Sequence, residues 1–387
     1  MISAFVASLA LLQIEQTPRL KETLPSGTYT YIERIASPGR ISVVMAASLA
    51  GVEQSPETHG YIHLVEHLAA RGRAKDVDVK LESQGMMLTA TTTRDAMIFQ
   101  IDGRTSQLNL ALEALKEIAS PAAEWTAEEI AAEVKTMAEE RALQSNRDLL
   151  TSSAWSLAFG PQGMDTFGDL AAMAAATPEK LKLTHAQIFS GSGLSIAVVG
   201  DIQVRDAQTS LAAAFGSAPA KGEPRQVPIR SVSEDKAGVN LRATGELRSA
   251  VIEGIDDVTG LAALQAAFAI SSEIEGAEPV LTPSTWRGVI SIRASKEGSF
   301  AAFDRMSEEE LASYFTMGQT LAIAWLKQQT ADPSSLAKLM AVISWQNRAL
   351  NPEVMRDRLI VVNQQQFINA MKKFQEDQAI IVKGGAE

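Results

Sequence analysis

The sequence predicts an α+β protein built from two similar domains, in each of which helices pack on a mixed β-sheet. Apolar segments of strand length alternate with longer Ala/Leu/Glu-rich segments that have helical character. The helix and strand at 177–189 and 194–200 have counterparts about 184 residues later, at 363–374 and 378–384. This repeated helix–strand pair predicts an internal duplication with a more degenerate second copy. A stretch rich in proline and glycine at 216–235 separates the two copies.

The composition limits the class of protein. The 387 residues include 35 basic and 46 acidic side chains, and the net charge of −11 argues against a nucleic-acid partner, which usually meets a basic face. The absence of cysteine excludes disulfide scaffolds, thiolate zinc sites and cysteine nucleophiles. Because the length is typical of two domains, we predict domains at 21–215 and 236–387, joined by a linker at 216–235.

Residues 1–20 form a separate predicted segment. Residues 2–12 are apolar, are too short to span a bilayer and have the length of the apolar part of an export signal. The basic residues that usually precede such a part are missing, so a cleaved signal and a buried strand or helix both fit. A signal predicts the bacterial periplasm or cell envelope, and a buried element predicts the cytoplasm. Elsewhere no apolar run approaches the roughly 18 residues of a membrane span, so no span is expected.

The first domain is predicted to begin with two strands and then to alternate helices with strands. Residues 29–32 and 41–45 are rich in the β-branched and aromatic side chains that favour strands. Thr126 and Glu129 have the spacing of a capping box, which predicts the start of a helix. The other predicted elements are helices at 63–71, 77–84, 106–119, 125–145, 177–189, 203–215 and 363–374, and strands at 88–93, 96–101, 194–200 and 378–384.

Three of the four histidines, His59, His63 and His67, lie within nine residues. No proline or glycine lies between residues 61 and 71, so a helix is predicted there. His63 and His67 then share one face, one turn apart, where both imidazoles can bind one metal ion. Glu66 lies beside them, placed to accept a proton from a water molecule at that metal. A polar, solvated helix face is the alternative interpretation.

The other two histidines are not predicted to bind a metal. His59 precedes the helix and is out of phase with the pair, so it is interpreted as a loop residue. His185 has no motif around it and is predicted to be structural or exposed.

The motif His63-x-x-Glu66-His67 resembles the signature of the pitrilysin, insulysin and mitochondrial processing peptidase family of zinc metallopeptidases. The resemblance extends through GYIHLVEHLAARG and LESQGMMLTATTTRDAMIFQI, which follow the family order of motif helix, second helix and Thr-rich strand pair. It covers about residues 25–220 well and the rest in outline. The resemblance implies two homologous α/β-sandwich domains, one zinc ion and endopeptidase activity on peptides or unfolded segments.

The same resemblance implies the remaining zinc ligand. In the family this ligand is a Glu on a later helix, usually the second of a Glu-Glu pair and seven residues after another Glu. Glu140 follows this rule, with Glu133 seven residues before it, and the adjacent Glu139 is the alternative ligand. Glu133 is then implied to orient the site or tune its charge without touching the metal.

The resemblance also implies that a peptide substrate adds a strand to the edge strand near Leu88–Thr92. The resemblance places Thr89, Ala90 and Thr91 against the substrate backbone. Thr89 stands where the family usually has Asn, which puts one substrate contact in doubt.

One part of the family pattern is missing from the second half. Active members resemble one another in an R-x-x-x-G-L-x-Y stretch, whose Arg and Tyr hold the substrate carbonyl. The nearest segment, aligned on Gly288, has Ser284 and Ser291 at these positions, and no tyrosine occurs between Tyr61 and Tyr314. The resemblance therefore implies the zinc-bearing subunit of a heterodimer whose sister chain supplies the pair, or a homodimer. A non-catalytic assembly subunit that keeps the fold is the alternative function.

Overall fold

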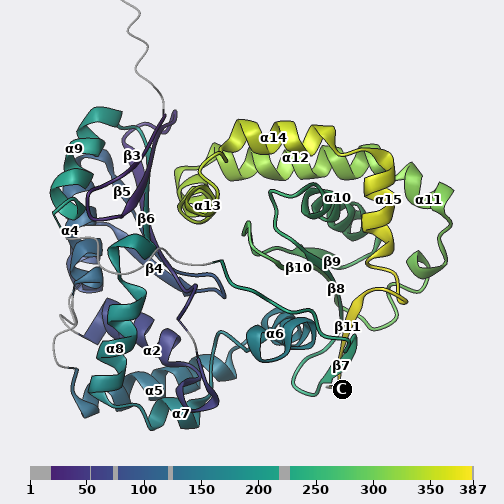
Figure 1. Ribbon diagram of the computed structural model, residues 1–387, viewed down its shortest axis with the longest axis horizontal. Helices are drawn as coiled ribbons and strands as arrows, with labels where there is room; N and C mark the ends of the chain where they lie inside the picture. Colours follow the sequence, from purple (N-terminus) through teal and green to yellow (C-terminus); the bar gives the residue numbers. More distant parts are fainter. Residues whose placement is uncertain (1–18, 53, 73–76, 121–124, 218–226, 386–387) are drawn as a thin grey trace, which may run out of the picture.

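The computed structural model of this chain contains two β-sheets, and helices pack against each of them (Figure 1). The structure describes residues 19–52, 54–72, 77–120, 125–217 and 227–385. The first sheet consists of β1 (Arg19–Thr23), β2 (Tyr29–Arg34), β3 (Arg40–Ser48), β4 (Met87–Thr92), β5 (Ala96–Arg104) and β6 (Leu194–Gly200). The second consists of β7 (Ala237–Asn240), β8 (Glu246–Ile252), β9 (Ala277–Val280), β10 (Gly288–Ala294) and β11 (Ile380–Gly384).

The strand order of the two sheets confirms the predicted α+β class. The first sheet has the order β1-β2-β6-β3-β5-β4 and the second has the order β7-β11-β8-β10-β9. Without β1, both sheets place their first, last, second, fourth and third strands side by side. In both sheets the first and last strands pair in parallel and all other pairs are antiparallel. An identical order and an identical set of directions are consistent with an internal duplication.

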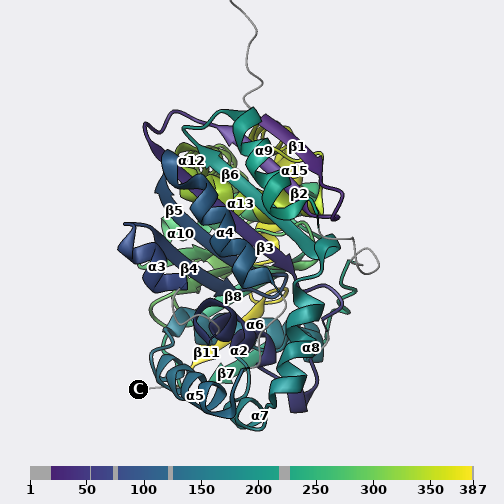
Figure 2. The same cartoon turned by 90° about the vertical axis from the view of Figure 1, so that its left-hand side faces the viewer.

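Helices cover both faces of the first sheet. Along β3, Val43 and Met45 join one core and Val44 joins another, as the alternation of side chains in a strand requires. Figure 2 shows α4 and α9 in front of this sheet, on the side away from α13. The helices are α2 (Tyr61–His67), α3 (Val77–Ser83), α4 (Leu108–Ala119), α5 (Ala127–Ala142), α6 (Asn146–Phe159), α7 (Leu170–Ala174), α8 (Pro178–Ile188), α9 (Val204–Phe215), α10 (Val258–Glu273), α11 (Glu308–Ser313), α12 (Phe315–Ala331), α13 (Pro333–Gln346), α14 (Pro352–Val361) and α15 (Gln364–Lys372).

The two halves exchange a helix, and this exchange joins them. Helix α6, from the first half of the chain, packs on the second sheet, where Leu150 and Trp155 share a core with Val382. Helix α13, from the second half, packs on the first sheet, where Met340 shares a core with Val44. Each sheet therefore buries apolar surface contributed by the other half, so the halves are expected to unfold together.

Most predicted elements are present, with two differences near the histidines and the glutamates. The predicted helix at 63–71 is α-helical only to His67 and continues as a π-turn over Leu68–Gly72. The predicted helix at 125–145 ends at Ala142, and Ser145 caps a new helix, α6, which the sequence did not predict. The segment 1–18 lies outside the described residues, so the export signal stays a prediction. Among the described residues, no helix is both long and apolar enough to cross a bilayer.

Candidate metal centre

The cluster His63, Glu66 and His67 lies on the short helix α2. Gly60 precedes this helix with φ of 101°, and a Cβ atom there would lie 2.9 Å from the Met173 side chain, so glycine suits the entry to the helix. Ligand atoms of His63, Glu66 and His67 all lie within 4.8 Å of one another. Glu66 and His67 are buried and His63 is half-buried. Apolar neighbours bury the rest of α2, which places these polar groups together at one opening.

Helix α5 brings two glutamates to His67 from opposite sides. Glu133 Oε2 lies 3.1 Å from His67 Nδ1, and Glu140 Oε2 lies 3.4 Å from His67 Nε2. Seven residues are close to two helical turns, which is why both carboxylates face α2. Glu139 is exposed. Glu140, the predicted ligand, thus approaches the cluster through His67, although it lies outside the compact group of three.

Each histidine of the pair keeps its Nε2 atom available for a metal. The Nδ1 atom of His63 donates to the Phe167 carbonyl at 3.2 Å, and the Nδ1 atom of His67 donates to Glu133. Arg71 lies 3.9 Å from the same Glu133 carboxylate. Metal-binding histidines typically donate their second ring N–H to a carboxylate or carbonyl in this way. The donor set and its outer contacts therefore fit a zinc ion.

Burial and neighbouring charges shift the pKa values of the cluster in different directions. Burial, together with the nearby His67, lowers the pKa of His63 to about 4. Burial also acts to lower the pKa of His67, but its hydrogen bond with Glu133 and the surrounding carboxylates raise that pKa overall. Burial raises the pKa of Glu66, and the hydrogen bond with His67 lowers the pKa of Glu133. At neutral pH His63 is therefore uncharged, which is the form that binds a metal.

Strand β4 forms the edge of the first sheet beside this cluster. Thr92, its last residue, donates a hydrogen bond from its hydroxyl to Glu66. Ala90 and Thr91 line a cavity of about 350 Å³ that also contains the histidine pair, whereas Thr89 does not line it. Of the predicted substrate-strand residues, the structure therefore brings two to the cluster and leaves Thr89 outside. The hydrogen bond from Thr92 to Glu66 was not predicted from the sequence.

The sequence around the cluster matches a known family. Residues 50–159, which contain α2, β4 and α5, match the model of the insulinase family, peptidase family M16. This match covers less than a third of the chain, so the likeness to this family lies in the segment around the cluster. A comparison with curated proteins finds no match.

Several solved structures share the fold of this chain over nearly its whole length. A protease from Helicobacter pylori has 15% identity and a TM-score of 0.78, with 94% of this chain and 98% of that chain covered. The first half of the periplasmic protease PqqL from Escherichia coli has 17% identity and a TM-score of 0.72, with 95% and 92% covered. An inactive M16 peptidase domain from Pseudomonas fluorescens has 18% identity and a TM-score of 0.73, with 95% and 97% covered.

The two remaining histidines lie outside the cluster, as the sequence predicts. His59 Nε2 lies 2.8 Å from the Asp165 carbonyl oxygen. His185 is 2% exposed, contacts the Ile118 carbonyl oxygen through Nε2 and packs against Trp125. Both have structural partners within the first half.

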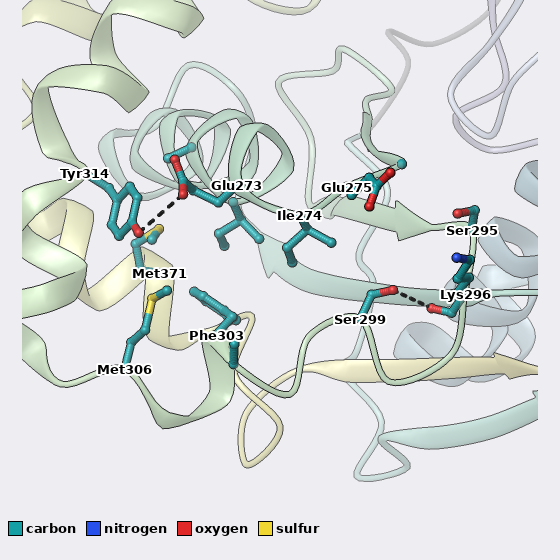
Figure 3. A pocket seen from close by; sticks show the side chains of 14 residues that line it. Glu273, Ile274, Glu275, Ser295, Lys296, Ser299, Phe303, Met306, Tyr314 and Met371 are labelled. Atoms are coloured by element: carbon teal, nitrogen blue, oxygen red, sulfur yellow. Dashed lines mark hydrogen bonds between the residues drawn. The ribbon is translucent and has the colours of Figure 1, made fainter.

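The second half of the chain offers no Arg/Tyr pair at the positions aligned with the M16 pattern. Ser284 is buried and hydrogen-bonds Gln346, and Ser291 lies buried on β10, 2.7 Å from the Ser249 hydroxyl. Tyr314 does not replace the missing tyrosine. It lines a separate cavity of about 510 Å³ beside α10, where its hydroxyl points toward Glu273 (Figure 3).

Proposed function

We propose that this chain is the zinc-binding catalytic subunit of an endopeptidase that hydrolyses peptides or unfolded segments. The observation that carries the proposal is the approach of Glu140 to the histidine pair of the M16 motif. Two ligand atoms of a tetrahedral zinc site, with bonds of 2.0–2.2 Å, lie roughly 3.3–3.6 Å apart. The 3.4 Å between Glu140 Oε2 and His67 Nε2 fits this separation. His63 supplies the other ligand.

Each residue around the cluster has a separate task in this proposal. A zinc ion held by His63, His67 and Glu140 would supply a Lewis acid that polarises the scissile carbonyl and acidifies water. Glu66 accepts the proton of the attacking water and later delivers it to the leaving amine. The raised pKa of Glu66 makes it a stronger base, and the hydroxyl of Thr92 holds one of its oxygens in place.

The substrate is proposed to pair its backbone with the outer edge of β4. Because β4 ends the first sheet, its outer N–H and C=O groups have no strand partner within that sheet. A peptide added there would pass directly over Glu66, to which Thr92 of the same strand is bonded. Ala90 and Thr91 lie along this path.

A partner subunit is part of the proposal, because donors for the substrate carbonyl are missing. Oxyanion donors are each worth about 10²–10³ in rate, and buried serines occupy both aligned positions. A sister chain with an R-x-x-x-G-L-x-Y stretch would complete the site, as a heterodimer, and a homodimer is the alternative. We also propose a cell-envelope location, which rests on residues 2–12 alone and is tested by cell fractionation.

Metal analysis combined with a fluorogenic peptide assay tests the proposal. We expect one zinc per chain and activity that rises when a sister chain is added. The Glu66→Gln variant should keep its zinc and lose about 10²–10⁴-fold in activity, since it removes the proton acceptor and leaves the ligands. Glu139→Gln, on the exposed face of α5, is the control and should keep both properties. A well-folded preparation that binds no zinc would overturn the proposal.

A non-catalytic assembly subunit is the second candidate. The serines at the two aligned positions favour it, and so does the shared fold with the inactive domain from Pseudomonas fluorescens. Against it stands the complete set of His63, Glu66 and His67 in one compact group. The assay above separates the two candidates. Zinc binding without any hydrolysis, both alone and with a sister chain, would favour the assembly subunit.

A further inference from the structure

A second cavity, of about 410 Å³, adjoins the metal cluster and has two arginines in its wall. His63, Thr92 and Glu140 line both this cavity and the one at the cluster, so the two spaces meet at the candidate catalytic residues. Arg94 and Arg147 line the second cavity and not the one at the cluster, and each also lines a further cavity, of about 540 Å³ for Arg94 and about 430 Å³ for Arg147. The loop after β9, in the second half of the chain, forms another part of its wall.

Arg94 is held in this wall with N–H groups that lack acceptors. Its guanidinium lies 4.6 Å from the centre of the Trp155 ring, a cation–π contact that fixes its plane. Its Nε and one Nη atom are enclosed and find no hydrogen-bond acceptor among the described residues. Enclosed donors without acceptors lower stability, so the side chain is set to gain from a ligand or solvent that supplies oxygen atoms. Burial lowers the pKa of Arg94 to about 10, which leaves it charged at neutral pH.

The carboxylates nearest to Arg94 are already bonded to other groups. The charges of Asp165 and Asp95 both act on Arg94. Asp95 forms a buried ion pair with Arg230, and Asp165 accepts hydrogen bonds from Ser152 and from one backbone N–H. Neither carboxylate is within hydrogen-bond distance of the Arg94 Nε atom. Asp165 and Asp95 therefore compensate the charge of Arg94 from a distance, and among the described residues no carboxylate forms an ion pair with it.

Two further carboxylates, those of Glu140 and Asp148, line the same cavity. Asp148 is bonded to Ser145, whose side chain caps α6, and Glu140 lies against His67. Arg147 is exposed and has no ion pair in the part of the chain that the structure describes. Arg94 and Arg147 are thus the charged side chains of this cavity for which the described residues provide neither a hydrogen bond nor an ion pair, whereas Asp148 and Asp165 accept hydrogen bonds from uncharged groups.

The position of Arg94 along the chain links it to the substrate. It follows Thr92, the last residue of the edge strand, by two residues. A peptide paired with β4 would have its chain directed past this turn and into the cavity. We propose that Arg94 and Arg147 form a carboxylate-binding subsite for the peptide, which takes an acidic side chain or the C-terminal carboxylate. The inference rests on the proposed function in that it assumes a peptide on β4, and it names the substrate class.

Peptide binding, measured without hydrolysis, tests the subsite. The probes are fluorescein-labelled ten-residue peptides of Ala, Leu and Ser that carry a single Glu or Gln at a scanned position, each with a free or an amidated C-terminus. They are titrated by anisotropy onto the Glu66→Gln chain, with its sister chain where one exists. At one position, or at the C-terminus, the carboxylate form should bind at least about tenfold more tightly than its neutral match, because a guanidinium–carboxylate pair is charge-assisted and bidentate.

Variants assign this preference to the two arginines. Arg94→Gln should reduce the preference to less than about threefold, and Arg147→Gln should reduce it in part. Arg94→Lys keeps the charge without the planar fork and should give an intermediate preference. Arg104→Gln, an exposed arginine at the far end of β5, is the matched control and should leave the preference unchanged.

The outcomes separate this inference from the proposed function. Equal binding of Glu and Gln peptides, with equal binding of acid and amide termini, overturns the subsite, as does failure to bind either set. Neither result depends on whether an arginine variant folds, because the peptide sets are compared on a chain that keeps both arginines. Hydrolysis of both peptide sets at equal rates by the chain that keeps Glu66 would refute the subsite and leave the proposed function standing. An acid preference in binding, with no hydrolysis by the chain that keeps Glu66, would support the subsite and count against the proposed function.

Discussion

Glu140→Gln is the substitution that tests the candidate metal centre most directly. It keeps the size of the side chain on α5 and removes the negative charge that lies 3.4 Å from His67 Nε2. Losing an outer contact of a ligand lowers metal affinity by about 10–100-fold, so losing a ligand should lower it by more than about 100-fold. Folding should change little, because Glu140 is only half-buried and faces the cavity.

The assay is a competitive zinc titration against a chromophoric chelator at neutral pH. Glu139→Gln removes the same charge from the adjacent, exposed position, so it controls for the general effect of one carboxylate on zinc affinity. We expect near-native affinity for the control and a large loss for Glu140→Gln. The reverse result, with Glu139→Gln losing zinc and Glu140→Gln keeping it, would refute the assignment. Near-native affinity in both variants would show that neither glutamate is a ligand.

Three further predictions concern the residues around the cluster and the interface between the two halves. Glu133→Gln should lower zinc affinity by about 10–100-fold in the same titration, and an unchanged affinity would contradict its role in orienting His67. Leu150→Ala on α6 should lower the free energy of unfolding by about 2–5 kcal/mol in a urea titration, whereas Leu143→Ala, 83% exposed, should change it little. For the zinc-free chain, the pKa of His63 in the folded state, about 4, lies below its ordinary value of 6.5, so the unfolded state binds more protons between these values. The free energy of unfolding should then decrease as the pH falls from 6.5 to 4, by up to about 3 kcal/mol, and a fall of equal size in His63→Gln would contradict this cause.

The exchanged helices explain why the stability of each half depends on contacts with the other. Trp155 on α6 lies between the first half and β10, where Gly288 leaves room for its ring. The linker adds Arg230, which pairs with Asp95 and donates to the Arg287 carbonyl. The turn after β4 is thereby connected to the second sheet, so a change in the packing of the halves would also move the surroundings of the candidate metal cluster.

Much of the candidate site was open to prediction because it depends on spacing within one helix. The interval between His63 and His67 puts both rings on one face of any helix, and the interval between Glu133 and Glu140 does the same for two carboxylates. The capping box at Thr126 and Glu129 is likewise local, and the structure forms it with bonds of 2.8 and 3.1 Å. The repeat of one helix–strand pair was enough to predict a duplication that the two strand orders match.

Contacts between elements could not be predicted in this way. The sequence left Glu139 and Glu140 as alternative ligands, because adjacent residues differ only in the face that they present, and only the packing of α5 against α2 selects Glu140. The hydrogen bond from Thr92 to Glu66 and that from His63 to the Phe167 carbonyl join residues 26 and 104 positions apart.

The sequence by itself determined which residues form the candidate metal cluster, the strand and helix types around it and the repeat of the fold. Only the tertiary structure decided which glutamate meets His67, which helix each half lends to the other and where Arg94 lies. The physical reason is that the backbone periodicity of a helix or strand fixes the relative directions of nearby side chains. The distances between elements follow instead from the burial of apolar surface summed over the whole chain, which no local pattern contains.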